Sequence, residues 1–504
     1  MNTTKAPHVV MLVDNSIEGD SRVQKQARSM KQKGWRVTLV GRTPRGKGPK
    51  RRKMAGVPTR FVTVPRLAGA QYQLHRSHLL RSPAAYPSKQ HATAKTALAQ
   101  YKVGHEKTRI DLQKLAGRDA GATRYWSRAR MMRARLTQAV TEFRARRTTE
   151  LRETRRHHSG WPDRLATAWW RFAHGREAWR KLDPHLLDWE MAYGPLIDRL
   201  KPDLIHANDH RMLFVAAKAV ERAHLAGRDP KLVWDAHEWV TGLEQRSKGD
   251  RWHPAQALLE SDFAENADAV VTVSETLAEM LRDHYDLPTL PSVVCNAPIM
   301  TGVVAPEKNV REVIGLAPDT PLMVYSGGVS PARGVDTIIR GLLHLPGVHF
   351  VMVVKIPFQP LVPELLSLAD ELGVADRVHT APYVPVDQIV PYLAGADLGI
   401  HSILHGPNNE IALATKFYEY AQSRLPIVVS DVKVMSETTR RTGQGEVFRA
   451  GDHKDLARAA REILDNPEKY QKAFDDEELM ASWTWEAQAE VLHAVYTDVL
   501  QGRA

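Results

Sequence analysis

The chain has 504 residues, of which 43% are hydrophobic and 25% charged, a composition that suits a folded protein of two or three domains and not a disordered or fibrous one. A single cysteine, Cys295, excludes an internal disulfide framework and fits a reducing compartment. The apolar run that follows the first residues is too short for the core of a signal peptide, and no run reaches the length of a membrane span. These features predict a cytoplasmic protein, either free or bound peripherally at the inner face of a membrane.

The net charge of +12 comes from one segment. Residues 71–180 contain 24 lysines and arginines against 8 aspartates and glutamates, which is +16 and leaves −4 for the rest of the chain. No Gly or Pro occurs from Ala122 to His158, where arginine alternates with helix-forming residues, so we expect a long basic helix or a helical hairpin.

The same segment carries five tryptophans: Trp126, Trp161, Trp169, Trp170 and Trp179. Two interpretations follow. The helices either lie on an anionic membrane with their indoles at the interface, or form an insertion that packs its tryptophans against its own domain. Nucleic acid is not expected as a partner, because no nucleic-acid-binding motif is recognisable.

A βαβ unit opens the chain. Val9–Val13 is a predicted strand, Asp20 or Ser21 caps a predicted helix that ends near Lys33, and residues 35–40 return as a second strand. This pattern implies a parallel sheet whose first loop lies at the carboxyl edge, where ligands bind in such folds. Arg22 follows the cap, and it is either a phosphate or acceptor contact or a solvated residue of the first turn. No Gly-x-Gly-x-x-Gly is present, so the dinucleotide-binding fingerprint is absent.

Three later strands, within residues 202–210, 232–239 and 267–275, each end in polar side chains. In a parallel sheet such ends converge on one cleft. Asp235, His237 and Glu238 are the sharpest group and indicate a functional site. His206, His210 and His237 are an alternative metal site, but His206 and His210 lie on a strand end and a loop, where their spacing does not align two ligands. We therefore predict no metal.

The second half begins with a strand at residues 322–326 that leads into a glycine turn with Gly327, Gly328 and Arg333. Backbone N–H groups of such a turn and the start of the following helix can bind a diphosphate, and Arg333 supplies a cation. A plain turn between strand and helix is the alternative.

A polar loop with Asn408 and Asn409 comes before a predicted helix of about three turns, which Pro426 ends. We expect either asparagine to cap this helix. Lys416 and Glu419 share one face of it, so the positive end of the helix and its polar face predict a site for an anionic, hydroxyl-rich ligand.

These motifs resemble the retaining glycosyltransferases of family four, also called glycosyl transferases group 1. The similar stretches are Asp20-Ser-Arg22, Asp235-x-His237-Glu238, the 327–334 glycine loop, and Lys416-x-x-Glu419-Tyr followed by Leu-Pro at 425–426. The resemblance covers about residues 8–45, 200–300 and 320–500, and leaves out the basic segment.

The resemblance implies an α/β protein with the GT-B fold, which has two Rossmann-like parallel-sheet domains, here with a basic helical insertion in the first. We expect an acceptor-side domain at residues 1–300, with the insertion at about 68–185, and a nucleotide-sugar-binding domain at 301–482. Residues 483–504 are expected to form a helix that crosses back to the first domain.

It also implies roles for single residues. Glu419 holds the ribose, and the 327–333 loop with Arg333 holds the phosphates. Because Gly328 occupies the position of the family's phosphate-binding arginine, Lys416 is our candidate replacement. Glu410 lies nine positions before Glu419 where the family has eight, so Glu410, Asn408 and Asn409 are alternatives for the sugar contact.

The catalytic candidates are therefore His237, Arg333 and Lys416. The donor-binding candidates are Gly327, Gly328, Arg333, Asn408, Asn409, Glu410, Lys416 and Glu419. The acceptor-side candidates are Asp20, Arg22, Asp235 and Glu238.

The sequence thus predicts a metal-independent, retaining glycosyltransferase, hexosyltransferase-like and without a cofactor. It would transfer a sugar from a nucleotide-sugar to a glycan, glycolipid or cell-envelope acceptor, as in polysaccharide biosynthesis, with the basic segment at residues 71–180 as a tether to an anionic membrane. The alternatives are a sugar-nucleotide epimerase or phosphorylase of the same fold, and a non-catalytic scaffold that works through the basic segment.

Overall fold

The computed structural model describes residues 6–44, 51–65, 67–68, 84–86, 89–157, 161–243, 250–355, 359–411 and 413–503. The chain divides into two compact units. The main unit contains Met1–Pro65, Trp189–Leu243 and Leu259–Ala504, and the helical unit contains Arg66–Asp188 and Glu244–Leu258.

The main unit contains two separate sheets. The first has the strand order β3-β4-β2-β1-β5-β6-β7-β8, and its pairs are parallel except for β3 with β4. Its strands are β1 His8–Leu12, β2 Arg36–Arg42, β3 Arg51–Met54, β4 Val57–Val62, β5 Leu204–Asn208, β6 Lys231–Ala236, β7 Ala269–Thr272 and β8 Ser292–Val293. Every residue of β1 and β5 is buried, as expected where helices cover both faces of a parallel sheet.

The helices of this sheet are α1 Ser21–Gln32, α7 Leu186–Leu200, α8 Asp209–Leu225, α10 Glu275–Tyr285 and the C-terminal α20 Trp485–Leu500, and α9 Trp252–Phe263 runs from the helical unit into the main unit. The Asp20 carboxylate accepts from the Val23 N–H and so caps α1, as predicted. Trp485, Leu492 and Tyr496 of α20 lie in the hydrophobic core of the first sheet, where the Trp485 indole donates to Ser29 Oγ at 2.8 Å.

The second sheet is wholly parallel, with the order β11-β10-β9-β12-β13-β14. Its strands are β9 Leu322–Ser326, β10 His349–Val353, β11 Val378–Ala381, β12 Leu398–His401, β13 Ile427–Ser430 and β14 Gly445–Phe448. Its helices are α11 Val310–Val313, α12 Val335–Gly341, α13 Val362–Glu371, α14 Ile389–Leu393, α15 Thr415–Gln422, α16 Lys433–Thr442, α17 His453–Asp465, α18 Pro467–Gln471 and α19 Glu477–Ser482.

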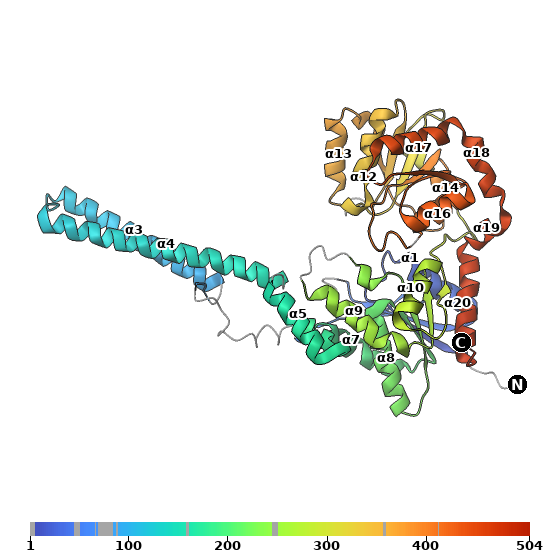
Figure 1. Ribbon diagram of the computed structural model, residues 1–504, viewed down its shortest axis with the longest axis horizontal. Coiled ribbons are helices and arrows are strands. Elements are labelled where there is room, and N and C mark those ends of the chain that lie inside the picture. The colour runs from blue at the N-terminus through green and yellow to red at the C-terminus, as the bar shows by residue number, and fades with distance from the viewer. Residues whose placement is uncertain are drawn as a thin grey trace. The chain divides into compact units, whose positions relative to one another are not determined.

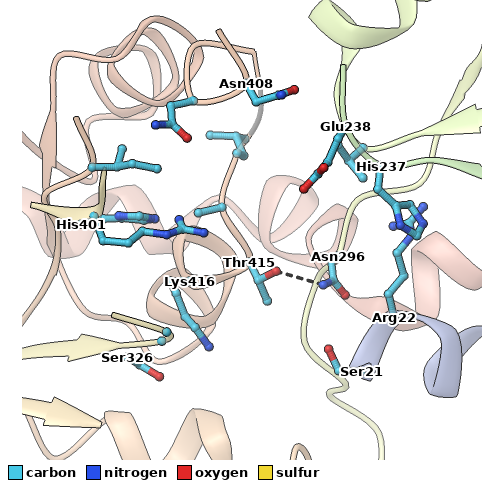
Figure 2. A pocket seen from close by; sticks show the side chains of 18 of the residues that line it. Ser21, Arg22, His237, Glu238, Asn296, Ser326, His401, Asn408, Thr415 and Lys416 are labelled. Carbon is cyan, nitrogen blue, oxygen red and sulfur yellow. Dashed lines mark hydrogen bonds between the residues drawn. The ribbon is translucent and has the colours of Figure 1, made fainter. Parts of the chain in front are cut away.

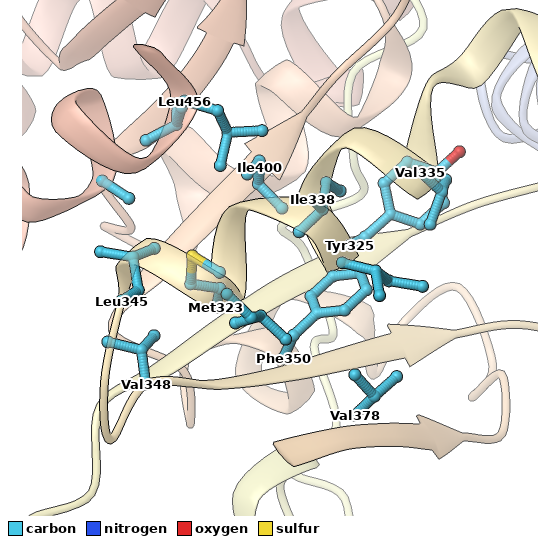
Figure 3. Close-up of a cluster of buried hydrophobic side chains, with 14 of the residues drawn as sticks. Met323, Tyr325, Val335, Ile338, Leu345, Val348, Phe350, Val378, Ile400 and Leu456 are labelled. Atoms are coloured by element: carbon cyan, nitrogen blue, oxygen red, sulfur yellow. The ribbon is translucent and has the colours of Figure 1, made fainter. Parts of the chain in front are cut away.

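Figure 3 shows how one face of this sheet is filled: Met323, Tyr325 and Phe350 from the strands pack against Ile338 of α12 and Leu456 of α17. Two parallel α/β domains are therefore present, and the predicted fold class is confirmed.

The helical unit contains α3 Lys89–Leu115, α4 Gly121–His157, α5 Trp161–His174 and α6 Trp179–Leu182. Figure 1 shows α3 and α4 lying side by side as a long hairpin. The Ser127 hydroxyl donates to Gln113 Oε1 at 2.8 Å, and the Tyr86 N–H to Thr148 Oγ1 at 2.8 Å, so the two helices run antiparallel. No helix in the described ranges is long and apolar enough to cross a membrane.

One local prediction is wrong. The helix that bears Lys416 and Glu419 begins at Thr415, with Ala414 at the N-cap and no capping side chain, so neither asparagine caps it. Asn408 is occupied elsewhere, because its Oδ1 accepts from the Trp239 N–H at 2.7 Å and its Nδ2 donates to the Trp239 carbonyl at 3.0 Å.

Candidate active site

A cavity of about 700 Å³ lies in the main unit, between the loops that follow the strands of its two sheets. From the first sheet it is lined by Asn15, Glu18–Arg22, His237, Glu238, Val273, Leu277 and Asn296. From the second it is lined by Tyr325–Gly328, Arg333, His401, Ile403, Asn408, Asn409, Ile411, Leu413–Lys416 and Met435. Figure 2 shows polar side chains facing it from both sides, linked where the Asn296 amide donates to Thr415 Oγ1 at 3.0 Å.

The predicted site residues divide into two groups. Ten line the cavity: Asp20, Arg22, His237, Glu238, Gly327, Gly328, Arg333, Asn408, Asn409 and Lys416. Asp235, Glu410 and Glu419 do not. Side chains up to several hundred positions apart in the sequence therefore face one space. Asp235 and Glu419 bind residues that line it, whereas Glu410 binds His405 and the start of α16.

The first wall is built on a buried ion pair. Arg22 reaches from the first turn of α1 to Asp235 in β6, with Nε donating to Oδ2 at 3.0 Å and Nη2 to Oδ1 at 2.8 Å. Asp235 is fully buried and also accepts from Gln26 Nε2 at 2.6 Å. Arg22 is only 5% exposed, so the interpretation of a solvated first-turn residue is wrong. Asp235 supports this wall from behind and has no surface of its own with which to contact an acceptor.

His237 lies beside this pair, with Nε2 3.1 Å from Asp235 Oδ2 and Nδ1 3.4 Å from Asp209 Oδ1. Burial alone would lower the pKa of the imidazole, but the two carboxylates outweigh it and raise the pKa to about 9. The protonated His237 ring donates from Nε2 to Asp235. That nitrogen therefore cannot accept from the Arg22 Nε–H, 3.0 Å away, and Arg22 keeps its bond to the carboxylate. At neutral pH His237 presents a positive charge to the cavity.

The three histidines that were weighed as an alternative metal site do not form a metal-binding group in the described ranges. His206 is fully buried, with Nδ1 2.8 Å from the Tyr496 hydroxyl of α20 and Nε2 3.4 Å from Asp235 Oδ2. Within the described ranges there is no group of three or more histidine, cysteine, aspartate or glutamate side chains that could hold a metal ion.

The second wall begins with the glycine loop after β9. Gly327 and Gly334 have φ angles of +149° and +60°, and a Cβ atom on Gly334 would lie 2.3 Å from the Ser402 carbonyl oxygen. Glycine at 334 therefore lets this loop lie directly against the end of β12. In the described part of the chain the Arg333 guanidinium has no ion-pair partner, so its charge is available to a ligand.

Lys416 and Glu419 lie one helical turn apart on α15, with Nζ 2.8 Å from Oε2. The Glu419 side chain is 10% exposed and that of Lys416 21%, so the carboxylate fixes the ammonium group of Lys416, whose side chain lines the cavity.

Glu410 has a structural role. Its Oε1 is 2.7 Å from His405 Nδ1 and its Oε2 accepts from the Lys433 N–H at 2.7 Å, at the start of α16. A carboxylate is well placed at a helix N-terminus, where free N–H groups and the helix dipole favour negative charge. Asn408 and Asn409, which line the cavity, are left as the candidates for a sugar contact.

His401 is a cavity residue for which the sequence analysis predicted no role. It ends β12, is 2% exposed, and neither of its ring nitrogens has a hydrogen-bond partner within the described ranges. Burial, together with the charges of Arg333 and Lys416, lowers its pKa to about 3, so the ring is neutral. Its position at a strand end is the signal that identified His237, and the same signal could have identified His401.

Comparisons with known proteins agree with this architecture. The description "Glycosyltransferase Family 4" matches residues 129–297 and "Glycosyl transferases group 1" matches residues 306–476, together about two thirds of the chain. The D-inositol 3-phosphate glycosyltransferase of Thermobispora bispora is 25% identical over 269 residues, 51% of this chain and 62% of that protein. The enzyme of the same name from Mycolicibacterium smegmatis is 25% identical over 48% of this chain and 56% of that protein. The chain thus matches less than two thirds of the length of these curated relatives.

Solved structures share the fold over nearly the whole chain. Sucrose-phosphate synthase from Thermosynechococcus elongatus superposes with a TM-score of 0.62 at 14% identity, covering 98% of this chain and all of that one. The Anabaena protein HepE in complex with UDP and glucose gives 0.57 at 13% identity, also over 98% of this chain and all of that one. Both sheets, the motifs on them and the two family matches lead to one conclusion: the chain belongs to the family-4, group-1 glycosyltransferases, as its motifs predict.

Proposed function

We propose that the protein is a retaining, metal-independent glycosyltransferase that moves a sugar from a nucleotide-sugar to a hydroxyl of a glycan, glycolipid or cell-envelope acceptor. The observation that carries the proposal is the cavity between the two sheets, which joins a glycine loop and two cations, Arg333 and Lys416, to an opposite wall with His237 and Glu238. Glycosyl transfer breaks a sugar–phosphate bond, and fixed cations and N–H donors stabilise the departing diphosphate.

The donor is proposed to lie on the second wall. The 327–333 loop would hold the diphosphate, with Arg333 and Lys416 neutralising its charge and Glu419 both fixing Lys416 and binding the ribose. HepE and a starch synthase of the same fold were solved with UDP and ADP respectively, which supports a donor that contains a nucleotide.

His401 is proposed to bind the donor as well. A buried imidazole without a partner is costly, and the cavity is where its nitrogens can find one. Because the ring is neutral, it can donate from one nitrogen and accept at the other, as a phosphate oxygen and a sugar hydroxyl would require.

The acceptor is proposed to enter along the first wall. His237, positively charged at neutral pH, would stabilise negative charge as the bond to the diphosphate breaks, rather than remove a proton. Glu18, Asp20 and Glu238 line the same side. Three carboxylates favour an acceptor rich in hydroxyl groups, which they can bind as hydrogen-bond acceptors. We also propose that the basic segment at residues 71–180 brings the enzyme to an anionic membrane, where a lipid-linked acceptor would be found.

The donor proposal is tested by thermal shift with UDP-, GDP-, ADP- and dTDP-sugars. One nucleotide class is expected to raise the melting temperature of the wild type but not of Arg333→Ala or Glu419→Ala. Arg340→Ala and Glu437→Ala are matched controls, because both side chains are exposed and outside the cavity, and they should respond as the wild type does.

If no donor raises the melting temperature of the folded protein, the proposed glycosyltransferase is contradicted and the non-catalytic scaffold remains. A shift without sugar transfer to a panel of glycan and glycolipid acceptors, but with conversion of the donor sugar to its epimer, would identify an epimerase instead.

A further inference from the structure

In the hairpin of α3 and α4, the large apolar side chains of α4 face away from α3 instead of lying between the two helices. The face of α4 toward α3 consists of residues three or four positions apart that are buried or half-buried: Ser127, Met131, Ala134, Gln138, Thr141, Ala145 and Thr148. Most of these are small or polar. In a helical hairpin surrounded by water the large apolar side chains normally lie between the helices.

The opposite face of α4 carries the large apolar side chains. Its members again recur every three or four residues: Tyr125, Ala129, Met132, Leu136, Val140 and Phe143. The five larger ones are 68%, 72%, 67%, 52% and 51% exposed in that order. We call these six residues the α4 stripe. It is about 27 Å long at the helical rise per residue, and in the part of the chain that is described nothing covers it.

Helix α5 has a second exposed face of the same kind. Trp161, Leu165, Trp169 and Phe172 follow one another at three- or four-residue spacing and are 73%, 61%, 60% and 86% exposed. Of the five tryptophans in the basic segment, Trp179 is buried. The interpretation that the insertion packs its tryptophans against its own domain is therefore wrong for Trp126, Trp161 and Trp169, which are exposed.

Arginines border the α4 stripe on both sides. Residues 121–147 contain eight arginines and one acidic residue, Glu142. Among the described residues, Arg128, Arg133, Arg135 and Arg146 have no ion-pair partner. At 100° per residue, Arg128, Arg135 and Arg146 lie along one edge of the stripe, and Arg133 lies with Trp126 along the other.

We infer that the α4 stripe and the exposed face of α5 bind the surface of an anionic membrane, with the apolar side chains at the acyl boundary and the arginines among the lipid phosphates. An amphipathic helix with this arrangement lies in the plane of the interface, and each basic residue there adds to binding. The proposed function gives residues 71–180 an anionic membrane as partner, and this inference adds which helix faces make the contact. It does not depend on transferase activity.

Two other occupants of these faces, a second copy of the chain and a nucleic acid, fit less well. A second copy of the chain would bring two sets of unpaired arginines together with almost no acidic residues to neutralise them. A nucleic acid would satisfy the arginines but has no use for a continuous apolar stripe, because its backbone is recognised by charge.

The test measures binding of the full chain to vesicles of phosphatidylcholine, with and without phosphatidylglycerol, by flotation. The wild type is expected to bind the anionic vesicles and not the neutral ones. Met132→Glu/Leu136→Glu should weaken binding by at least about tenfold. Both side chains are about two thirds exposed or more, so the substitutions leave the fold intact.

The matched control is Leu225→Glu/Leu290→Glu, which makes the same change at exposed positions of the main unit, 91% and 52% exposed, and should bind as the wild type does. Arg128→Gln/Arg135→Gln/Arg146→Gln should weaken binding to anionic vesicles by about 100-fold at low salt and reduce its salt dependence.

The inference is overturned if the wild type ignores anionic vesicles, or if the Met132/Leu136 variant binds them as the wild type does. Two further outcomes would also overturn it. In the first, the protein binds no vesicles but self-associates, and Met132→Glu/Leu136→Glu abolishes the self-association. In the second, the protein binds duplex DNA and Met132→Glu/Leu136→Glu does not weaken that binding. The donor thermal shift is measured on the same variants. Loss of vesicle binding with an intact donor shift leaves the proposed enzyme standing, whereas vesicle binding without any donor shift contradicts the enzyme and not the membrane contact.

Discussion

Replacing Arg22 by alanine is expected to destabilise the main unit far more than the loss of an ordinary ion pair, because it leaves a carboxylate charged and buried. Asp235 is fully buried, and Arg22 donates to both of its oxygens. Removing one partner of a buried pair costs about 3–5 kcal/mol. An exposed pair contributes about 0–1 kcal/mol.

The assay is urea denaturation at neutral pH, with Arg52→Ala as the matched control. Arg52 pairs with Glu18 at 2.9 Å, with the two side chains 34% and 48% exposed, so its loss should cost no more than about 1 kcal/mol. Arg22→Ala combined with Asp235→Asn should recover part of the stability, because a neutral amide in that place no longer needs a cation. If Arg22→Ala costs no more than Arg52→Ala, the buried pair does not stabilise the fold and the reasoning is refuted.

Three further predictions concern single residues of the cavity. Because the pKa of His237 is raised from 6.5 to about 9 on folding, its own contribution to stability is complete below about pH 6.5 and is lost as the pH rises through 9. That contribution is up to about 3 kcal/mol, so in urea titrations between pH 6 and 10 the difference in stability between the wild type and His237→Gln should shrink by about that amount; a constant difference would contradict it. Gly334→Ala should cost more than about 2 kcal/mol, since the new Cβ atom would meet the Ser402 carbonyl in a left-handed conformation, whereas Gly302→Ala, with open space around it, should cost clearly less; equal melting temperatures would contradict this. His401→Leu keeps the side-chain volume nearly the same and removes two nitrogens that have no hydrogen-bond partner among the described residues, so the melting temperature without donor should not fall, while the Kd of the donor should rise about five- to tenfold; an unchanged Kd would show that His401 does not touch the donor.

Local chemistry in the sequence was enough to predict many of the strands, the parallel sheets and the glycine loop, but not β3, β4 or β14. Continuous apolar runs such as β1 belong to sheets covered on both faces, and the Asp20 cap acts on the helix that directly follows it. The density of arginine without Gly or Pro likewise predicted the long helix α4. Each of these depends on neighbours within a few residues, which a sequence displays directly.

The partners of polar side chains were decided only by the tertiary structure. Nothing near Arg22 in the sequence indicates that it binds Asp235, 213 positions away, and a first-turn arginine alone is usually solvated. Asn408 would cap a helix if local geometry were all that mattered, but the backbone of Trp239 offers it a donor and an acceptor together. Glu410 is likewise drawn to the start of α16.

Which face of a helix is buried also needed the structure. The sequence of α4 has two stripes of nearly equal spacing, one small and polar and one large and apolar, and pattern alone favours burial of the apolar one. The packing of α3 against α4 buries the small residues instead and leaves the large ones exposed. Periodicity specifies which residues share a face, but only the position of the neighbouring helix decides which face meets water.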